Sequence, residues 1–313
     1  MTNMSEFPGM GWLPDLPDYR DYTIDTNKIA DRKKELGQKP PKSLFTTLKV
    51  LKPPKDAVTA SVDLHNDFSP IEDQGSLGSC TANAGVGLVE YFEKRAFGRH
   101  IDASRLFLYK VTRNLLGWTG DTGAYMRTTM GAMTLFGVPP ENFWPYTTRR
   151  HPGPAGERTF DEEPTAFLYS YAQNYQALSY FRLDPSGISR ADLLSRIKTL
   201  IAAKWPSMFG FTVFSSIYQV SSTGEIPFPT SAESVLGGHA VVACGYDDAK
   251  KIKNTNPGGP TTTGALMIRN SWGTGWGASG YGWLPYEYVI QGLAVDWWSL
   301  FRVEWVDSGQ FGF

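Results

Sequence analysis

The sequence predicts an α+β protein with two lobes and a cleft between them. Apolar residues recur at the spacing of helix faces between Cys80 and Phe136, whereas short apolar runs typical of strands follow Pro164. Helices that come first and strands that come second suit an α+β fold. A chain of 313 residues, 41% of them hydrophobic, is long enough to bury a sizeable core, as one two-lobed domain or as two small domains.

The composition excludes several classes of protein. A formal net charge of −1 gives no argument for a nucleic-acid partner or an anionic membrane surface. No apolar run approaches the roughly 18 residues that span a bilayer. The first eight residues contain neither a basic nor an apolar stretch, so no signal peptide is visible. We therefore expect a cytoplasmic protein, or one exported by a route that this sequence does not encode, and two cysteines are too few for a disulfide scaffold.

Residues 1–60 differ in composition from the rest of the chain. Prolines recur at short spacing in Gly11–Tyr22, which predicts an extended strap because proline also restricts the residue before it. Two interpretations are open. The segment is either propeptide-like and lies in or near the cleft, or it is a structural arm that packs Trp12, Leu13 and Leu16 on the body.

Residues 61–313 are expected to form the main body, with the helical lobe at about 61–165. A first helix is predicted from residue 80 to about residue 98. A second helix contains the apolar residues of 106–111, and a third covers 125–136.

The strand-rich lobe is expected at about 166–313. Ser189–Asp192 resembles a capping box that opens a helix with one apolar face. Three strands are predicted, at 207–214, 240–246 and 265–269. The charged, glycine-rich insert 247–264 is interpreted as a mobile surface loop.

The stretch Gln74–Ala84 carries the first functional signal. A polar, glycine-rich loop leads into Cys80, and the predicted helix begins at that cysteine. A thiol at a helix N-terminus faces unpaired N–H groups and the positive end of the macrodipole, which favour the thiolate. Because the thiolate is the nucleophile, this position suits covalent catalysis by cysteine.

Two further motifs lie far downstream, Gly-Gly-His-Ala-Val around His239 and Asn-Ser-Trp-Gly-x-Gly-Trp-Gly from Asn270. Together with Gln74 and Cys80, and in this order, they resemble papain-type cysteine peptidases and are closest to bacterial members of that family. Three separate segments agree in chemistry and order, which makes the signal specific. The resemblance covers about residues 61–300. It implies a papain-like fold with a helical left lobe, a β-barrel-like right lobe and the active-site cleft between them.

The resemblance implies a role for each of four residues. Cys80 is the nucleophile, His239 is the base, and Asn270 orients the imidazole. Gln74 donates to the oxyanion together with the backbone N–H of Cys80, and donors of this kind are worth about 10²–10³ in rate. We expect a cysteine endopeptidase zymogen that acts through a thiolate–imidazolium pair and an acyl-enzyme, without a metal ion or a cofactor.

Five other residues have expected roles in support or substrate binding. Trp272 shields the histidine–asparagine hydrogen bond, and Trp276 lines the leaving-group side. The backbone of Gly123 pairs with an extended substrate, and Gly238 bears on substrate preference. For Asp296 two interpretations are open. It is either the base of the S2 pocket, where an acid would admit a basic P2 side chain, or a structural aspartate hydrogen-bonded beside the tryptophans that follow it.

The chain departs from its secreted relatives at the nucleophile loop. Leu77 occupies the position of a disulfide cysteine, so that bridge is absent, which agrees with a reducing compartment. Thr81 replaces the usual tryptophan after the nucleophile and removes no catalytic group. Cys244 follows His239 on the same predicted strand at an odd offset, which points it to the opposite face as a core residue.

The expected partner is a peptide or protein substrate, with the strap as a possible self-inhibitor, and the chain is expected to be a monomer. Two rival functions remain open. The same four residues could transfer the acyl group to an amine, as transpeptidases of this clan do. A non-catalytic binding or effector module is disfavoured because all four residues are intact.

Overall fold

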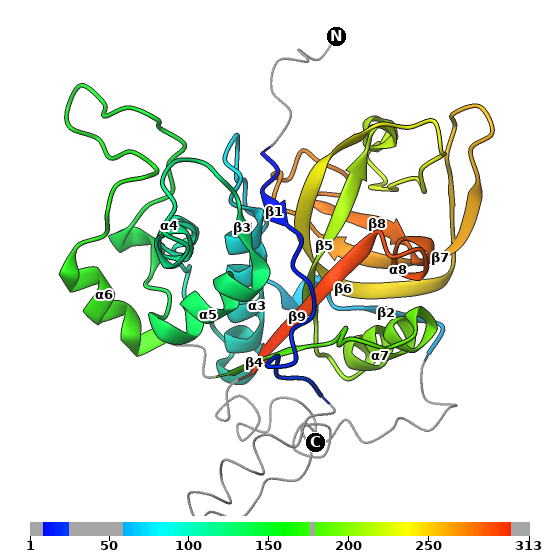
Figure 1. Ribbon diagram of the computed structural model, residues 1–313, viewed down its shortest axis with the longest axis horizontal. Helices are drawn as coiled ribbons and strands as arrows, with labels where there is room; N and C mark the ends of the chain where they lie inside the picture. The colour runs from blue at the N-terminus through cyan, green and yellow to red at the C-terminus, as the bar shows by residue number, and fades with distance from the viewer. Residues whose placement is uncertain (1–8, 25–58, 176–178, 302–313) are drawn as a thin grey trace, which may run out of the picture.

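The computed structural model describes residues 9–24, 59–175 and 179–301. In this part of the chain, α4, α5 and α6 lie on one side, the large sheet with α7 and α8 forms the other side, and α3 runs between them (Figure 1). The helices are α3 (Cys80–Phe97), α4 (Arg105–Leu115), α5 (Met126–Leu135), α6 (Ala166–Ala172), α7 (Arg190–Ala202) and α8 (Tyr286–Ile290). Short 3-10 helices are η1 (His65–Asp67), η2 (Glu141–Phe143), η3 (Gln173–Tyr175) and η4 (Ser215–Gln219). None of the described helices is long and apolar enough to cross a membrane.

The large sheet has seven strands, and neighbouring strands are antiparallel. In spatial order the main path contains β4 (Ser179–Arg182), β9 (Ala294–Phe301), β5 (Ser207–Phe214), β6 (Val235–Lys253), β7 (Thr261–Arg269) and β8 (Tyr281–Pro285). Strand β2 (Ser61–Asp63) pairs with β6 off this path. The predicted two-lobed α+β fold is confirmed. The strand-rich lobe is an open path from β4 to β8 rather than a closed barrel among the described strands.

Helix α3 is buried along most of its length because other helices and the sheet cover it. All its residues from Cys80 to Phe92 are buried. Small residues allow this close packing, since a Cβ at Gly87 would lie 2.9 Å from Nη1 of Arg269. The helix ends at Gly98, as predicted, with a φ of 70° that favours glycine. The N-terminus of α3 is thereby fixed where the helices meet the sheet.

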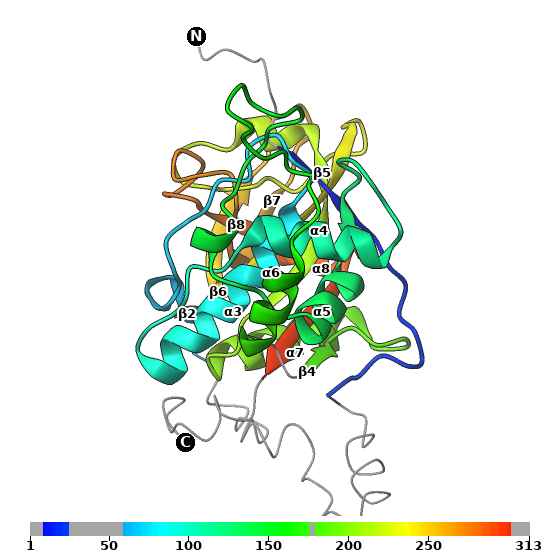
Figure 2. The same cartoon turned by 90° about the vertical axis from the view of Figure 1, so that its left-hand side faces the viewer.

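Most predicted elements are present. The helices expected at 106–111 and 125–136 are α4 and α5, and the expected strands are β5 and parts of β6 and β7. Helix α6 lies beyond the expected lobe boundary near residue 165, yet it packs on the helical side. The ring of Tyr169 lies 5.6 Å from that of Phe107 and 5.4 Å from that of Phe136. Figure 2 shows α4, α5 and α6 on the same face. The exact division into lobes stays a prediction.

The prediction of a loop over 247–264 is wrong. Strand β6 continues to Lys253 and β7 begins at Thr261, so most of this insert is a β-hairpin. Its turn is held from outside, because Asn254 Nδ2 donates to Glu233 Oε1 at 2.6 Å and to the Phe228 carbonyl at 2.9 Å. Charge and glycine content indicated a loop, whereas pairing between the strands decided the conformation.

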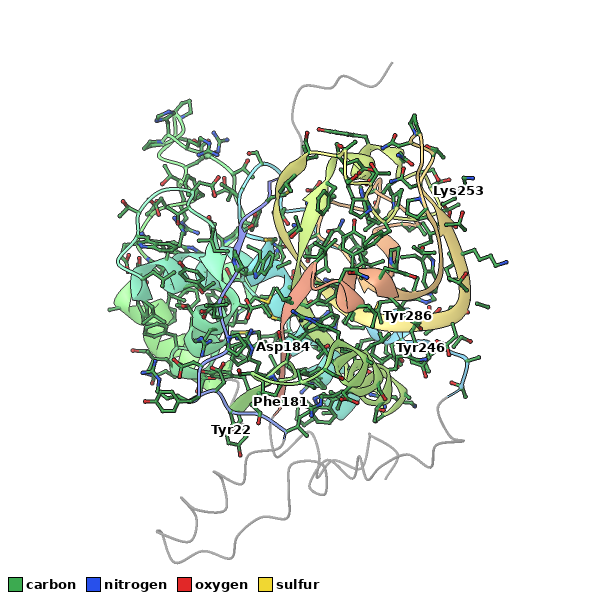
Figure 3. All side chains as sticks on the ribbon, turned by 45° about the vertical axis from the view of Figure 1, so that its right-hand side comes forward. Tyr22, Phe181, Asp184, Tyr246, Lys253 and Tyr286 are labelled. Carbon is green, nitrogen blue, oxygen red and sulfur yellow. The ribbon has the colours of Figure 1, made fainter. Side chains whose placement is uncertain are left out.

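The N-terminal segment 9–24 crosses from the lobe boundary to the edge of the sheet (Figure 1). At its lower end the backbone N–H of Arg182 donates to the Tyr22 carbonyl at 2.6 Å. Figure 3 shows Tyr22, Phe181 and Asp184 in this region, on the other side of the molecule from Tyr246. Tyr22 and Arg182, which are far apart in the sequence, are therefore hydrogen-bonded at β4, the edge strand of the sheet.

The N-cap of α7 offers a stability test. Ser189 Oγ accepts a hydrogen bond from the Asp192 N–H at 3.1 Å, as the capping pattern predicts. Ser189→Ala should lower the free energy of unfolding by about 1 kcal/mol, because one helix-end donor loses its partner. Chemical denaturation measures this change. Ser186→Ala, in the exposed turn before the helix, is the control, and equal effects of the two substitutions would contradict the assigned cap.

Candidate active site

The strap, defined here as residues 9–24, runs between the helical side and the sheet (Figures 1 and 2). Its strand β1 (Trp12–Leu13) pairs in parallel with β3 (Ala124–Tyr125). The N–H of Ala124 donates to the Gly11 carbonyl at 2.8 Å, and the N–H of Gly9 donates to the Gly75 carbonyl at 2.9 Å. The strap is therefore held by backbone hydrogen bonds to the loop that precedes α3 and to β3.

Cys80 is the first residue of α3, as predicted, and its side chain is fully buried. Burial raises the pKa of this thiol to about 11. Hydrogen bonds with backbone groups of Ala240, Gly11, Thr81 and Trp12 act in the opposite direction and lower that pKa in part. Two of these four residues belong to the strap, so the strap backbone lies directly against the predicted nucleophile.

His239 and Asn270 lie on neighbouring strands, which brings them together. His239 is in β6, and Asn270 directly follows β7, the strand paired with β6. His239 Nε2 lies 2.7 Å from Asn270 Oδ1. That oxygen also accepts the Ser271 N–H at 2.8 Å, so it is an acceptor and Nε2 carries the proton. In the neutral imidazole, Nδ1 is then the free base.

A tryptophan covers this pair. The ring of Trp272 stacks on the imidazole of His239 with centroids 4.4 Å apart and planes at 27°. Trp276 meets Trp272 edge-on at 5.5 Å. Burial lowers the pKa of His239 to about 4, and the hydrogen bond to Asn270 acts in the opposite direction. The position of Trp272 agrees with the shielding role that the sequence predicts.

The described state holds the thiol and the imidazole in their neutral forms near neutral pH. The pKa of Cys80 lies far above 7 and that of His239 far below it. Both shifts have the same cause, because water is excluded from both side chains and an isolated charge is costly without solvation. Exposure of both side chains to water would lower the pKa of the thiol and raise the pKa of the imidazole.

Gln74 is fully buried, and its amide is used at both ends. Nε2 donates to the Gly9 carbonyl at 2.7 Å and to the Leu77 carbonyl at 2.8 Å, whereas Oε1 accepts from Ser271 Oγ at 2.6 Å. The two carbonyl oxygens can only accept, so they fix which end of the amide is the donor. The predicted oxyanion donor thus faces a carbonyl oxygen of the strap.

Three of the four predicted substrate-binding residues lie against the strap. A Cβ at Gly123 would be 2.3 Å from the Gly11 carbonyl oxygen, and one at Gly238 would be 2.5 Å from that of Trp12. Asp296 Oδ2 accepts the indole N–H of Trp12 at 3.1 Å. The fourth, Trp276, packs against Trp272 instead.

Sequence reasoning missed the arginines that anchor the strap. Arg127 pairs with the carboxylates of Asp15 and Asp21. Arg182, which is 1% exposed, donates to the Asp15 carbonyl at 3.1 Å and pairs with Asp184 at 2.9 Å. The sequence shows that aspartates recur in the strap. That recurrence does not indicate which cations they would contact.

Cys244 is buried and free, as predicted for a core residue. Its Sγ lies 3.6 Å from the Met267 carbonyl, and burial raises the pKa of its thiol. Within the described residues, no group of three or more His, Cys, Asp or Glu side chains could hold a metal ion.

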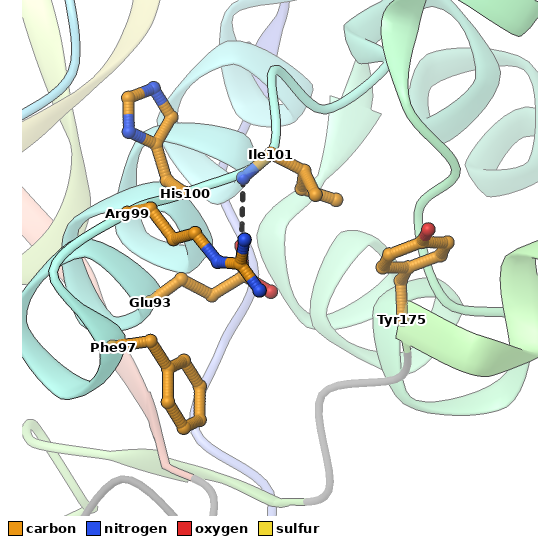
Figure 4. A pocket seen from close by; sticks show the side chains of 6 residues that line it. All are labelled: Glu93, Phe97, Arg99, His100, Ile101 and Tyr175. Atoms are coloured by element: carbon orange, nitrogen blue, oxygen red, sulfur yellow. Dashed lines mark hydrogen bonds between the residues drawn. The ribbon is translucent and has the colours of Figure 1, made fainter.

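A hollow of about 750 Å³ lies at the other end of α3 (Figure 4). It is lined by Glu93, Phe97, Arg99, His100, Ile101 and Tyr175. A carboxylate oxygen of Glu93 accepts the Ile101 N–H at 3.2 Å, so part of this lining is committed to local structure. None of the predicted catalytic or substrate-binding residues lines this hollow. The predicted nucleophile, Cys80, is at the opposite end of α3.

A helix-start thiol beside a histidine–asparagine pair, with an amide aimed at a bound carbonyl, defines a cysteine peptidase with a two-lobed fold. The sequence pattern of the family described as "Papain family cysteine protease" matches residues 58–291, and the chain belongs to this family. The predicted family, fold and peptidase class are therefore confirmed.

Individual relatives agree with this assignment. An uncharacterized peptidase C1-like protein, L477, of Acanthamoeba polyphaga mimivirus is 31% identical over 94% of this chain and 86% of its own length. The crystal structure of xylellain, a cysteine protease from Xylella fastidiosa, has a TM-score of 0.69 and 30% identity over 94% of this chain and 96% of that one. The digestive procathepsin L 3 of Tenebrio molitor, at 21% identity and a TM-score of 0.57 over 90% and 83%, shows the same fold.

Asn270 provides a kinetic test of the histidine–asparagine pair. Asn270→Ala should lower kcat about tenfold or more and leave KM nearly unchanged, because it removes the group that orients the base and not one that binds substrate. Steady-state kinetics measure both constants, on a chain in which Gly11→Ala displaces the strap. A change in KM alone would contradict the orienting role.

Proposed function

We propose that this cysteine peptidase hydrolyses peptide bonds through a thiolate–imidazolium pair and an acyl-enzyme, and that the strap holds it inactive. The observation that carries the proposal is the backbone of Gly11 and Trp12 at the Cys80 thiol, in a site whose chemical groups are otherwise complete. The neighbour described as a procathepsin agrees with a blocking segment before the catalytic domain.

The proposed reaction uses this chain's residues as follows. His239 Nδ1 takes the proton of Cys80, and the thiolate attacks the peptide carbonyl carbon. The C–N bond breaks, and His239 returns its proton to the departing amine. Water then attacks the thioester and gives a proton to His239, which releases the carboxylic acid and restores the thiol. Gln74 Nε2 and the backbone N–H of Cys80 hold the oxyanion in both halves.

The direction of the strap supports inhibition rather than cleavage. In a productive peptide, the P2 residue precedes the residue whose carbonyl is attacked. In the strap, Gly9 offers its carbonyl to Gln74, whereas Trp12, later in the chain, reaches Asp296 at the expected base of the S2 pocket. The order is the reverse of a substrate's, so the strap occupies the site without presenting a bond in the reactive orientation.

The space between the strap and the nucleophile loop admits only glycine at two positions of the strap. A Cβ at Gly9 would lie 2.1 Å from the Leu77 carbonyl oxygen, and one at Gly11 would lie 1.9 Å from that of Gly78. Those atoms belong to the backbone of the nucleophile loop and are not free to move aside. The strap therefore approaches the loop more closely than any residue with a side chain could.

The packing interpretation accounts for only part of the strap. Trp12 is 5% exposed and fits a buried anchor, but Leu16 is 83% exposed and packs on little. The structural-arm interpretation required both to be buried. Ordering of the segment instead comes from backbone contacts at the site and from the cations of Arg127 and Arg182. A tethered segment acts at high effective concentration, so modest affinity is sufficient to block the site.

Gly11→Ala in the full chain tests this restraint. The added methyl group clashes with the Gly78 backbone, so the strap should leave the site and kcat/KM should rise roughly tenfold or more. Hydrolysis of an unstructured protein measures the rise, and a free peptide of residues 9–24 should reverse it at high concentration. Leu16→Ala, on an exposed strap side chain, is the matched control.

An alternative outcome would refute inhibition. If Gly11→Ala lowers the thermal unfolding temperature and leaves kcat/KM of the folded enzyme unaltered, the strap is structural packing only. Hydrolysis is separated from acyl transfer by adding an amine acceptor and comparing ligated with hydrolysed product. Reaction of Cys80 with a thiol-directed label in the Gly11→Ala variant distinguishes a catalytic site from a non-catalytic binding cleft.

A further inference from the structure

We propose that the pocket filled by Trp12 recognises a tryptophan side chain of the substrate at P2, and that Asp296 is the specificity-determining residue because it accepts the indole N–H. This inference rests on the proposed peptidase function, since the substrate must enter the same cleft. It is carried by the juxtaposition of two glycines and one buried carboxylate around the indole.

The two glycines make room for the ring. A Cβ at Gly210 would lie 1.9 Å from Cε2 and 2.2 Å from Cδ2 of Trp12, and one at Gly238 would lie 2.8 Å from Cε3. Neither glycine has a positive φ, so the backbone itself accepts any residue at these positions. At both positions the absence of a side chain leaves space for the fused ring against strands β5 and β6.

The carboxylate supplies the polar part of the recognition. Asp296 is fully buried, and Oδ2 accepts Nε1–H of Trp12 at 3.1 Å. A phenylalanine or leucine in the same place would bury that oxygen without the donor. Sites built around such a bond reject ligands that lack the donor, because the unpaired buried group is costly.

Asp296 is held in place before any ligand arrives. Its φ of 63° lies in the left-handed region, which is unfavourable for most side chains. Asp184 stabilises this conformation, because its carboxylate accepts the Asp296 N–H at 2.8 Å and the Trp297 N–H at 2.9 Å. The acceptor therefore has a fixed direction, as a selective pocket requires.

One oxygen of Asp296 is already engaged, which leaves Oδ2 as the acceptor for a P2 side chain. Oδ1 accepts the indole N–H of Trp298 at 2.7 Å and lies 3.3 Å from Nη1 of the buried Arg182. A cation at P2 would have to share these carboxylates with Arg182, which already pairs with Asp21, Asp184 and Asp296. A neutral side chain with one N–H donor fits the remaining acceptor better.

The test uses the full chain with Gly11→Ala, which displaces the strap, and Trp12→Ala, which vacates the pocket. Acetyl-Xaa-Gly coumarinylamides are compared with tryptophan, benzothienylalanine, leucine or arginine at Xaa. Benzothienylalanine has the size and shape of tryptophan but a sulfur in place of the N–H. We expect kcat/KM for tryptophan to exceed that for benzothienylalanine at least roughly tenfold, and that for arginine by more.

Variants assign this preference to the pocket. Asp296→Asn keeps the size and suits the left-handed conformation, and it should bring the tryptophan-to-benzothienylalanine ratio toward unity. Gly210→Ala should reduce cleavage of the substrate with tryptophan at P2 and retain cleavage of the one with leucine, because the methyl group takes the ring's space. Gly237→Ala, where a Cβ would meet only the flexible Met10 side chain at 3.3 Å, is the matched control and should keep the wild-type preference.

A binding measurement separates this inference from the proposed function. Calorimetry with the Cys80→Ala, Gly11→Ala, Trp12→Ala chain and the uncleaved acetyl-Xaa-Gly amides needs no turnover. Tenfold tighter binding of the tryptophan compound supports the pocket even if hydrolysis is absent, in which case only the proposed function fails. Equal binding of tryptophan and benzothienylalanine, or binding of neither, overturns the inference even if the chain hydrolyses peptides.

Discussion

The backbone of Gly11 and Trp12 lies against the Cys80 thiol and keeps water away from it. Burial of the thiol beneath this contact raises its pKa, whereas hydrogen bonds with the backbone of the same two residues lower it in part. A thiolate–imidazolium pair needs solvation or close donors to be more stable than the neutral pair, and burial removes the first of these. The raised pKa of Cys80 and the lowered pKa of His239 follow from the same exclusion of water. Burial therefore disfavours the thiolate–imidazolium charge state in this structure.

The same contact explains why the strap resembles a bound peptide. It uses a carbonyl for Gln74, a backbone pairing beside Gly123 and a ring for the pocket at Asp296. These are the features that a substrate would use, taken in the reverse chain direction. Under the proposed function, inhibition and specificity depend on one surface, and we infer from the residue that fills the pocket what the pocket accepts.

The sequence was sufficient for the helix-start cysteine and for the histidine–asparagine pair, because a local motif marks the start of α3 and two more lie on or directly after the adjacent strands β6 and β7. It was insufficient where long-range contacts decide the outcome. Arg182 is buried among carboxylates from the strap and from β9, and no local pattern indicates such a cluster. The position of Trp12 depends on glycines 210 and 238, far away in the chain. The hairpin at 247–264 likewise depends on strand pairing that overrides its polar composition.

The ionisation of Cys80 in the intact chain tests this account most directly. NMR of isotope-labelled cysteine Cβ, followed against pH in a Cys244→Ala background, reports the protonation of this one thiol in the full chain and in Gly11→Ala. The account predicts a thiol that stays protonated through neutral pH in the full chain, in line with a pKa of about 11, and a thiolate near neutral pH once Gly11→Ala displaces the strap. A thiolate at neutral pH in the full chain, or identical titrations of the two proteins, would contradict it.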